Sequence, residues 1–219
     1  MIKLVMFDLD GTLLDNEEFT ISSKIIEGKK IGYNLTEDII KKTIGMSSKL
    51  SKKYFQSIYG EDFPYEYFRQ KRFDYIFESV RNQGLRLKKG AQEIISFCKE
   101  NNIKIALCTS SPSKYIIEYQ KYTNFFEQFD LIITGDMIKN GKPDKEIFQK
   151  AIDFFNVNSN ESLVVEDSIN GIKAGINANS NVIMVPDLIE PNEEIIQMNV
   201  KVLNSLNDVI EYIYKINWR

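Results

Sequence analysis

Short apolar segments alternate with segments of helical periodicity from Gly84 onward, and this alternation restricts the possible folds more than any other feature of the sequence. The predicted strands cover residues 103–108, 131–133, 163–165, 182–185 and 200–203. The predicted helices cover residues 91–100, 113–122, 145–155, 169–177 and 206–216. Short apolar strands separated by helices predict a parallel sheet covered on both faces, so we expect a doubly wound, Rossmann-like α/β fold.

The segment before Gly84 has a different pattern. Residues 2–7 form an apolar run typical of a buried strand, whereas apolar residues between 16 and 83 recur at helical spacing. The chain has 219 residues, about one and a half domains of typical size. We therefore predict a Rossmann-like core of residues 1–15 and 84–219, into which residues 16–83 are inserted as a small α-helical cap domain.

The absence of histidine excludes several kinds of active site. Without a histidine in the chain, Ser-His-Asp and Cys-His nucleophile pairs, histidine-ligated zinc and histidine-ligated haem are ruled out. The net charge of −3 argues against a nucleic-acid partner. Cys98 and Cys108 lie in apolar segments, where we expect buried free thiols.

No apolar stretch reaches the ~18 residues of a membrane span. The amino-terminal run is too short for the apolar part of a secretory signal. We therefore expect a cytoplasmic protein that has no membrane partner.

Polar residues directly follow several predicted strands. Because the carboxyl ends of parallel strands meet at one edge of the sheet, these residues are expected to converge there. They are Asp8 and Asp10 after the first strand, Thr109, Ser110 and Ser111 after the second, Lys142 in the loop after the third, and Glu166, Asp167 and Ser168 after the fourth.

This set of residues predicts phosphate chemistry. Carboxylate oxygens suit a hard cation such as Mg²⁺, which would offset the repulsion among neighbouring acids. Hydroxyls and backbone amides before a helix, together with a lysine, are typical of a phosphate site. Phosphoryl transfer through an aspartyl-phosphate fits the pattern. One aspartate attacks phosphorus, and a second, two residues on, protonates the leaving oxygen and later activates water.

Four segments of the chain resemble, in order, the motifs of the haloacid dehalogenase superfamily. They are Asp8-Leu9-Asp10-Gly11-Thr12, Thr109-Ser110-Ser111, Gly141-Lys142-Pro143 and the run from Val165 to Ile172. The helical insert resembles the small C1 cap of that superfamily. The Glu-Asp-Ser-x-x-Gly form of the last motif is most similar to the beta-phosphoglucomutase-like branch of sugar-phosphate phosphatases and mutases.

The resemblance implies a role for each matching residue. Asp8 is expected to be the nucleophile and a metal ligand, and Asp10 the general acid/base, whose backbone carbonyl also binds Mg²⁺. Asp167 is expected to bind the metal, with Glu166 close behind it. The residues expected to hold the phosphoryl group are Thr109, Ser110 through its amide, and Lys142.

Cap residues bear on the choice between hydrolysis and mutase chemistry. The mutases of this branch place an arginine after the serine of a substrate loop that resembles residues 45–49, whereas this chain has Ser48 followed by Lys49. They also use a histidine near the position of Thr20. Both differences favour hydrolysis of a monophosphate over a beta-phosphoglucomutase-type mutase. Thr20, Ser48 and Lys49 are predicted to set the specificity.

Two alternatives from other classes remain open at this point. A receiver-like phospho-accepting signalling domain also gathers acids, a hydroxyl and a lysine, although it lacks a helical insert after its first strand. A non-catalytic binding module would not need every catalytic position to be intact. We predict a Mg²⁺-dependent phosphatase that acts, as a monomer, on a small phosphorylated metabolite of the sugar-phosphate type.

Overall fold

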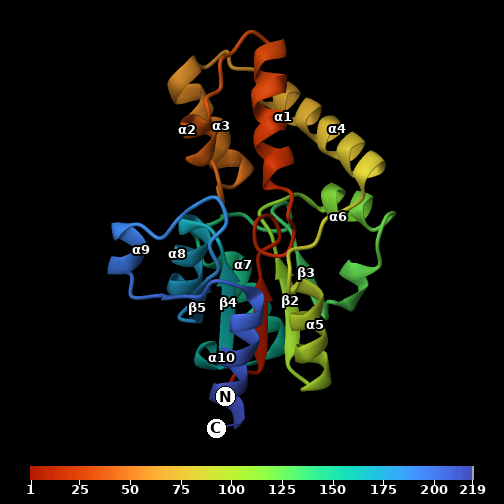
Figure 1. The fold of residues 1–219 in the computed structure, drawn as a ribbon. Helices are drawn as coiled ribbons and strands as arrows, with labels where there is room; N and C mark the ends of the chain where they lie inside the picture. The colour runs from red at the N-terminus through yellow and green to blue at the C-terminus, as the bar shows by residue number, and fades with distance from the viewer. Residues whose placement is uncertain (219) are drawn as a thin grey trace.

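The computed structural model describes residues 1–218, apart from the side chain of Glu17, and its centre is a parallel β-sheet. The strands are β1 (Leu4–Phe7), β2 (Lys104–Cys108), β3 (Leu131–Ile133), β4 (Ser162–Glu166), β5 (Asn181–Met184) and β6 (Lys201–Val202). Their order is β3-β2-β1-β4-β5-β6, and every neighbouring pair is parallel. The predicted doubly wound α/β core is confirmed (Figure 1).

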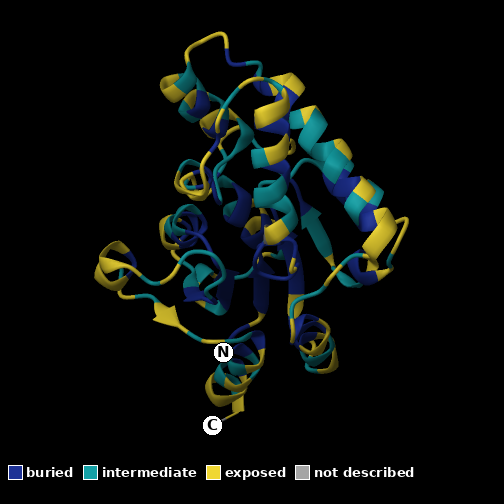
Figure 2. Cartoon of the chain, turned by 45° about the horizontal axis from the view of Figure 1, so that its top comes forward, coloured by how far each residue is buried: buried dark blue, intermediate teal, exposed yellow. Residues whose placement is uncertain are grey.

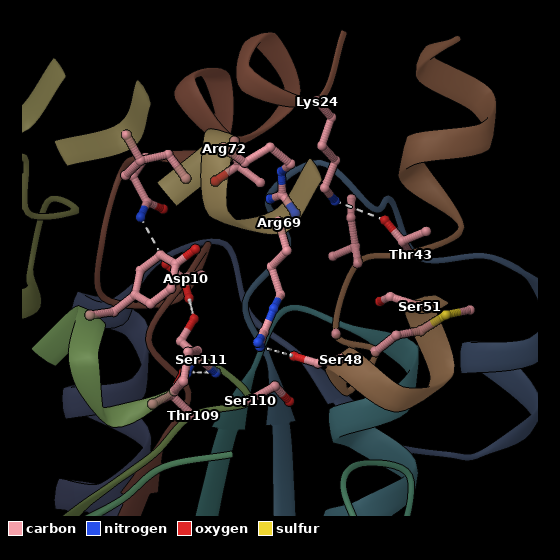
Figure 3. Close-up of a pocket in the computed structure, with 18 of the residues that line it drawn as sticks. Asp10, Lys24, Thr43, Ser48, Ser51, Arg69, Arg72, Thr109, Ser110 and Ser111 are labelled. Atoms are coloured by element: carbon pink, nitrogen blue, oxygen red, sulfur yellow. Dashed lines mark hydrogen bonds between the residues drawn. The ribbon is translucent and has the colours of Figure 1, made fainter. Parts of the chain in front are cut away.

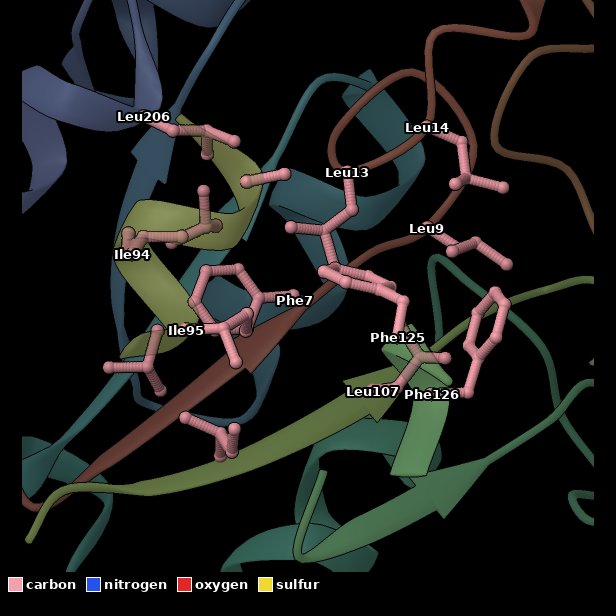
Figure 4. Packing of buried hydrophobic residues seen from close by; sticks show 14 of the residues in the cluster. Phe7, Leu9, Leu13, Leu14, Ile94, Ile95, Leu107, Phe125, Phe126 and Leu206 are labelled. Atoms are coloured by element: carbon pink, nitrogen blue, oxygen red, sulfur yellow. The ribbon is translucent and has the colours of Figure 1, made fainter. Parts of the chain in front are cut away.

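Helices cover both faces of this sheet. They are α5 (Ala91–Glu100), α6 (Ser113–Tyr119), α7 (Glu146–Phe155), α8 (Ile169–Asn177), α9 (Glu193–Gln197) and α10 (Leu206–Trp218), with short 3₁₀ turns at Phe125–Gln128 and Ser159–Glu161. Successive residues of a strand point to opposite faces. Phe7 therefore packs in the hydrophobic cluster with α5 and α10 (Figure 4), whereas Met6 packs in the cluster with α7 and α8. Figure 2 shows the buried strands between more exposed outer helices.

Four helices inserted after β1 form the cap at the top of Figure 1. They are α1 (Glu17–Lys30), α2 (Glu37–Lys41), α3 (Ser48–Tyr59) and α4 (Tyr65–Gln83). These helices share a hydrophobic cluster of their own, in which the Phe55 ring lies 5.3 Å from the Phe63 ring and 5.6 Å from the Phe68 ring. The predicted helical insertion is confirmed.

The two connections between cap and core run side by side. Leu14 and Leu87 form an antiparallel bridge. The Asp15 amide donates to the Arg86 carbonyl at 2.9 Å, and the Lys88 amide donates to the Leu13 carbonyl at 2.9 Å. The outgoing and returning segments are therefore bonded to each other.

Several element limits differ from the sequence prediction. Helix α6 ends at Tyr119 instead of residue 122, because the amides of Lys121 and Tyr122 bond three residues back in a tight turn. Helix α9 has five residues and was not predicted, since so short a segment shows no clear period. Among the described residues, no helix is both long and apolar enough to cross a membrane.

Candidate active site

A cavity of about 140 Å³ lies between the carboxyl end of the sheet and the cap (Figure 3). Phe7 at the end of β1 pairs with Leu107 of β2 and Val165 of β4, so the residues that follow these strands lie at one level. The core residues in the lining include Asp8, Asp10, Thr109, Ser110, Ser111 and Asp167. The cap residues include Thr20, Lys24, Thr43, Ser48, Ser51, Tyr65, Arg69 and Arg72. The structure therefore brings the strand-end residues together, as expected.

Lys142 connects two acidic side chains beneath this cavity. Its fully buried ammonium group donates to Asp8 Oδ1 at 2.5 Å, Glu166 Oε1 at 2.6 Å and the Cys108 carbonyl at 2.9 Å. Burial raises the pKa of Asp8, and the charge of Lys142 opposes that rise. Burial lowers the pKa of Lys142, but the charges of Asp8 and Glu166 outweigh it and hold this pKa above its usual value. Lys142 stays charged, and its three protons are all used by the protein.

Glu166 uses both of its carboxylate oxygens within the core. Oε1 accepts from Lys142, while Oε2 accepts from the amides of Asp167 and Ser168 at 3.1 and 3.0 Å and from the Ser168 hydroxyl at 2.9 Å. These bonds fix the loop that follows β4. Glu166 therefore lies behind the residues that face the cavity and does not line it.

The buried acids Asp8, Glu166 and Asp167 could hold a metal ion, because each has a ligand atom within 4.8 Å of the others. All-oxygen ligands fit a hard cation such as Mg²⁺. Protein donors occupy both carboxylate oxygens of Glu166, whereas Lys142 bonds only Oδ1 of Asp8, so Asp8 and Asp167 are the better ligands. Gly11, at φ +87°, is required beside them, since a Cβ there would lie 2.4 Å from Asp167 Oδ2. Asp10 is expected to contribute only its backbone carbonyl, and its side chain lies outside the group found among the described residues.

The Asp10 carboxylate is held from two sides. Oδ1 accepts from Asn16 Nδ2 at 2.8 Å, and Oδ2 accepts from the Ser111 hydroxyl at 2.7 Å. Asn16 stands at the start of the cap helix α1, whereas Ser111 follows β2 in the core. Asp10 and Asp8 both line the cavity, so the two carboxylates can reach the same ligand.

The loop after β2 offers hydroxyl groups to the cavity. Thr109 is buried, and its Oγ1 accepts from the Ser111 amide at 3.0 Å. Among the described groups, Ser110 Oγ is buried and has no hydrogen-bond partner. Buried hydroxyls normally have one, so this atom is placed for a ligand.

The predicted cap residues do not all face the cavity. Thr20 and Ser48 line it, whereas Lys49 lines a neighbouring cleft together with Lys53 and Lys139. Ser48 and Lys49 are consecutive residues of helix α3, and consecutive helical residues point in different directions.

Sequence reasoning predicted Thr20 and Ser48 but missed the other polar residues that the cap adds to the cavity. Asn16, Thr20 and Lys24 recur every fourth residue along α1, and Tyr65, Arg69, Arg72 and Ile76 share one face of α4. This helical spacing of polar residues is the signal that could have found them.

The cap and the core touch beside the cavity. A Cβ added to Gly141 in the core would lie 2.4 Å from the Cβ of Ser47 in the cap. Ser47 caps the amino end of α3, where its hydroxyl accepts from the Leu50 amide. A glycine at position 141 therefore allows the two parts to approach closely.

Comparisons with known proteins place the chain in a family. The family model of haloacid dehalogenase-like hydrolases matches residues 5–185. A phosphorylated carbohydrates phosphatase from Thermotoga maritima is 29% identical over 177 residues, which cover 81% of this chain and 82% of that protein. A (DL)-glycerol-3-phosphatase from Arabidopsis thaliana is 29% identical over 199 residues, which cover 85% of this chain and 80% of that protein.

Solved structures share the fold. A beta-phosphoglucomutase from Clostridium difficile has a TM-score of 0.82 at 24% identity, with 98% of this chain and 96% of that chain covered. A hydrolase from Pseudomonas syringae has a TM-score of 0.84 at 22% identity, with 98% and 99% covered. The family match rules out the receiver-like signalling domain and confirms the resemblance to the haloacid dehalogenase superfamily. The phosphatase relatives confirm that the chain is a phosphatase-type hydrolase. The chain belongs to the haloacid dehalogenase-like hydrolases and has the fold of their beta-phosphoglucomutase-like branch.

Proposed function

We propose that the chain is a Mg²⁺-dependent phosphatase that hydrolyses a small phosphorylated metabolite of the sugar-phosphate class. The observation that carries this proposal is the pair of carboxylates in one cavity. Asp8 is bonded to Lys142, and Asp10 is oriented by Asn16 and Ser111. The names of the relatives support the substrate class, because one acts on phosphorylated carbohydrates and another on glycerol 3-phosphate.

The reaction would proceed in two displacements at phosphorus. In the first, Asp8 forms a bond to phosphorus, the bond to the leaving oxygen breaks, and Asp10 gives that oxygen a proton. In the second, Asp10 takes a proton from water, whose oxygen attacks the phosphorus and releases inorganic phosphate and free Asp8. Fixing the Asp10 carboxylate from two sides keeps it in reach of both oxygens.

The remaining site residues would stabilise the charge on the phosphoryl group. Asp8, Asp167 and the Asp10 carbonyl would hold Mg²⁺, which supplies positive charge against the phosphoryl oxygens when bound. Thr109 and Ser110 would donate to the same oxygens. Lys142 would neutralise the charge of Asp8. Glu166 would hold Lys142 and the loop after β4 in place.

Hydrolysis of p-nitrophenyl phosphate tests this proposal. We expect activity in Mg²⁺ that EDTA abolishes and Mg²⁺ restores. Asp8→Asn is expected to lower kcat by at least about 10³-fold, because it removes the nucleophile. Asp15→Asn, at an exposed position, is the matched control and should keep wild-type activity. Activity that survives EDTA or Asp8→Asn would overturn the proposal, and complete inactivity of the wild type would favour a binding module.

One observation favours the mutase alternative. Arg69 Nη1 donates to Ser48 Oγ at 3.4 Å, so a guanidinium reaches the loop in which the resembling mutases carry an arginine. The test is to supply beta-glucose 1-phosphate with a catalytic amount of glucose 1,6-bisphosphate. Release of inorganic phosphate supports the phosphatase, whereas accumulation of glucose 6-phosphate supports the mutase.

We also propose that residues 1–15 and 84–219 form the catalytic core, that residues 16–83 form the cap, and that the protein is a cytoplasmic monomer. The separate hydrophobic cluster of the cap supports this division. Light scattering coupled to size exclusion should give the mass of a single chain, and the mass of a dimer would contradict the monomer.

A further inference from the structure

One carboxylate oxygen of Asp187, in the loop after β5, has no partner in the protein. Among the described groups, none bonds to Oδ2 of this side chain, although the atom is buried. A buried carboxylate oxygen normally accepts a hydrogen bond or contacts a cation, because the loss of water must be offset. The surroundings of this oxygen therefore indicate what it is placed to contact.

Oδ2 of Asp187 lies close to an expected metal ligand. The Val185 amide donates to the Glu166 carbonyl at 2.8 Å, so the chain past β5 runs beside the loop that carries Asp167. A Cβ added to Gly11 would lie 2.4 Å from Asp167 Oδ2 and 3.2 Å from Asp187 Oδ2. The two carboxylate oxygens therefore approach the same glycine from two neighbouring loops.

The other oxygen of Asp187 is held by Lys88. The Lys88 ammonium group donates to Oδ1, and the two side chains are only 19% and 17% exposed. Lys88 belongs to the connection that returns from the cap, and its amide donates to the Leu13 carbonyl at 2.9 Å. The ion pair thus fixes the carboxylate and offsets its charge, while Oδ2 stays available as an acceptor.

A bound Mg²⁺ would bring donors to this place. The ion usually binds one or two carboxylates directly and keeps several water ligands, whose protons need acceptors. Carboxylates that stand behind the direct ligands commonly take this part. Both oxygens of Glu166 are already occupied by Lys142, by two backbone amides and by the Ser168 hydroxyl. Oδ2 of Asp187 has no such donor.

We propose that Asp187 is an outer carboxylate of the metal centre, which accepts a hydrogen bond from a water ligand of Mg²⁺, and that Lys88 holds it for this contact. Asp187 does not line the cavity, so it acts on the reaction through the ion, as a positioning residue. The inference rests on the Mg²⁺ dependence of the proposed phosphatase and extends its metal centre to the loop after β5.

Calorimetric titration of Mg²⁺ into the metal-free protein, without substrate, tests the inference. Asp187→Ala should raise the dissociation constant about 10- to 100-fold, the usual loss when such an outer partner is removed. Asp187→Asn keeps an acceptor oxygen and should lose less. Glu190→Gln is the matched control, because Glu190 belongs to the same loop but is exposed, and its affinity should stay close to that of wild type.

A double variant separates the contact with the ion from the ion pair. In Asp187→Ala alone, Lys88 loses its counter-charge, and its positive charge would itself repel the cation. Lys88→Met combined with Asp187→Ala removes this repulsion but not the missing acceptor. We expect the double variant to bind Mg²⁺ at least about tenfold more weakly than wild type. Recovery of wild-type affinity would show that Asp187 only neutralises Lys88 and would overturn the inference.

Hydrolysis of p-nitrophenyl phosphate gives a second readout. Asp187→Ala should raise the Mg²⁺ concentration for half-maximal activity in parallel with the dissociation constant, whereas kcat at saturating Mg²⁺ should fall far less. A loss of kcat with unchanged Mg²⁺ affinity, or no change in either, would overturn the inference. If Asp187→Ala weakens Mg²⁺ binding but the wild type hydrolyses no phosphate ester, the inference stands and the phosphatase proposal fails.

Discussion

The positive charge of Lys142 offsets the negative charges of two buried carboxylates. A charged group that is taken out of water is stable only if opposite charges and hydrogen bonds replace the lost solvent. Here the ammonium group bonds to Asp8 and Glu166, and the remaining proton goes to the Cys108 carbonyl. The site is therefore held together by a residue whose own side chain is fully buried.

Removal of this charge should cost stability as well as activity. We expect Lys142→Met to lower the free energy of unfolding by about 3 kcal/mol, because two buried acids lose their shared cation. Urea denaturation measures the change. Lys139→Met, which removes an exposed lysine from the same loop, is the control and should stay within about 0.5 kcal/mol of wild type. Equal stability of Lys142→Met and wild type would contradict this account.

The two cysteines should be inert in the folded protein. Both are buried free thiols, and burial raises the pKa of Cys98 and of Cys108 to about 12. A thiol reacts as its thiolate, so reaction needs both access and ionisation. A thiol reagent at pH 8 should label neither cysteine in the native state and both in urea. Rapid labelling of the native protein would show that the sheet around Cys108 opens.

Helices α1 and α4 each present two kinds of residue. Apolar positions pack within the cap or on the core, and a polar stripe on each helix lines the cavity. The apolar period could be read from the sequence, because it decides whether a helix forms at all. The polar stripe could not be assigned a function, since surface helices usually direct such residues to solvent. Only the packing of α1 and α4 over the sheet edge places Lys24, Arg69 and Arg72 above the aspartates.

The contact between residues 141 and 47 should control how closely the cap approaches the core. Gly141→Ala places a methyl group against Ser47, and overpacking of this kind costs about 1–3 kcal/mol. We expect kcat/KM to fall about tenfold, with little change in the free energy of unfolding, because a small outward movement of the cap relieves the clash. Steady-state kinetics and urea denaturation measure the two effects.

A compensating variant checks the cause of this loss. Ser47→Gly removes the opposing Cβ and leaves a residue that is tolerated at the start of a helix. The double variant Ser47→Gly with Gly141→Ala should therefore recover most of the activity. If the double variant is as slow as Gly141→Ala, steric contact between cap and core is not the reason.

At the scale of the whole molecule, the strand order explains where the site is. From β1 the chain moves outward through β2 and β3, then returns to the other side of β1 for β4, β5 and β6. Loops that leave the sheet at such a reversal diverge and open a crevice. Asp8 stands at this point, and the cap is inserted just after it. The alternation of apolar runs was enough to predict the sheet and the residues at its edge. The cap's share of the site was not predictable, because it depends on contacts between segments far apart in the chain.

The bonded connections between cap and core have a mechanical consequence. Because the segments around Leu14 and Leu87 are joined to each other, they cannot slide independently, and the cap is expected to rotate as one body about this ribbon. Rotation would carry Arg69 and Arg72 away together, while Lys142 stays bonded to Asp8 in the core. A ligand that contacts both the cap and the core would oppose this rotation, so its residence time would depend on its contacts with both parts.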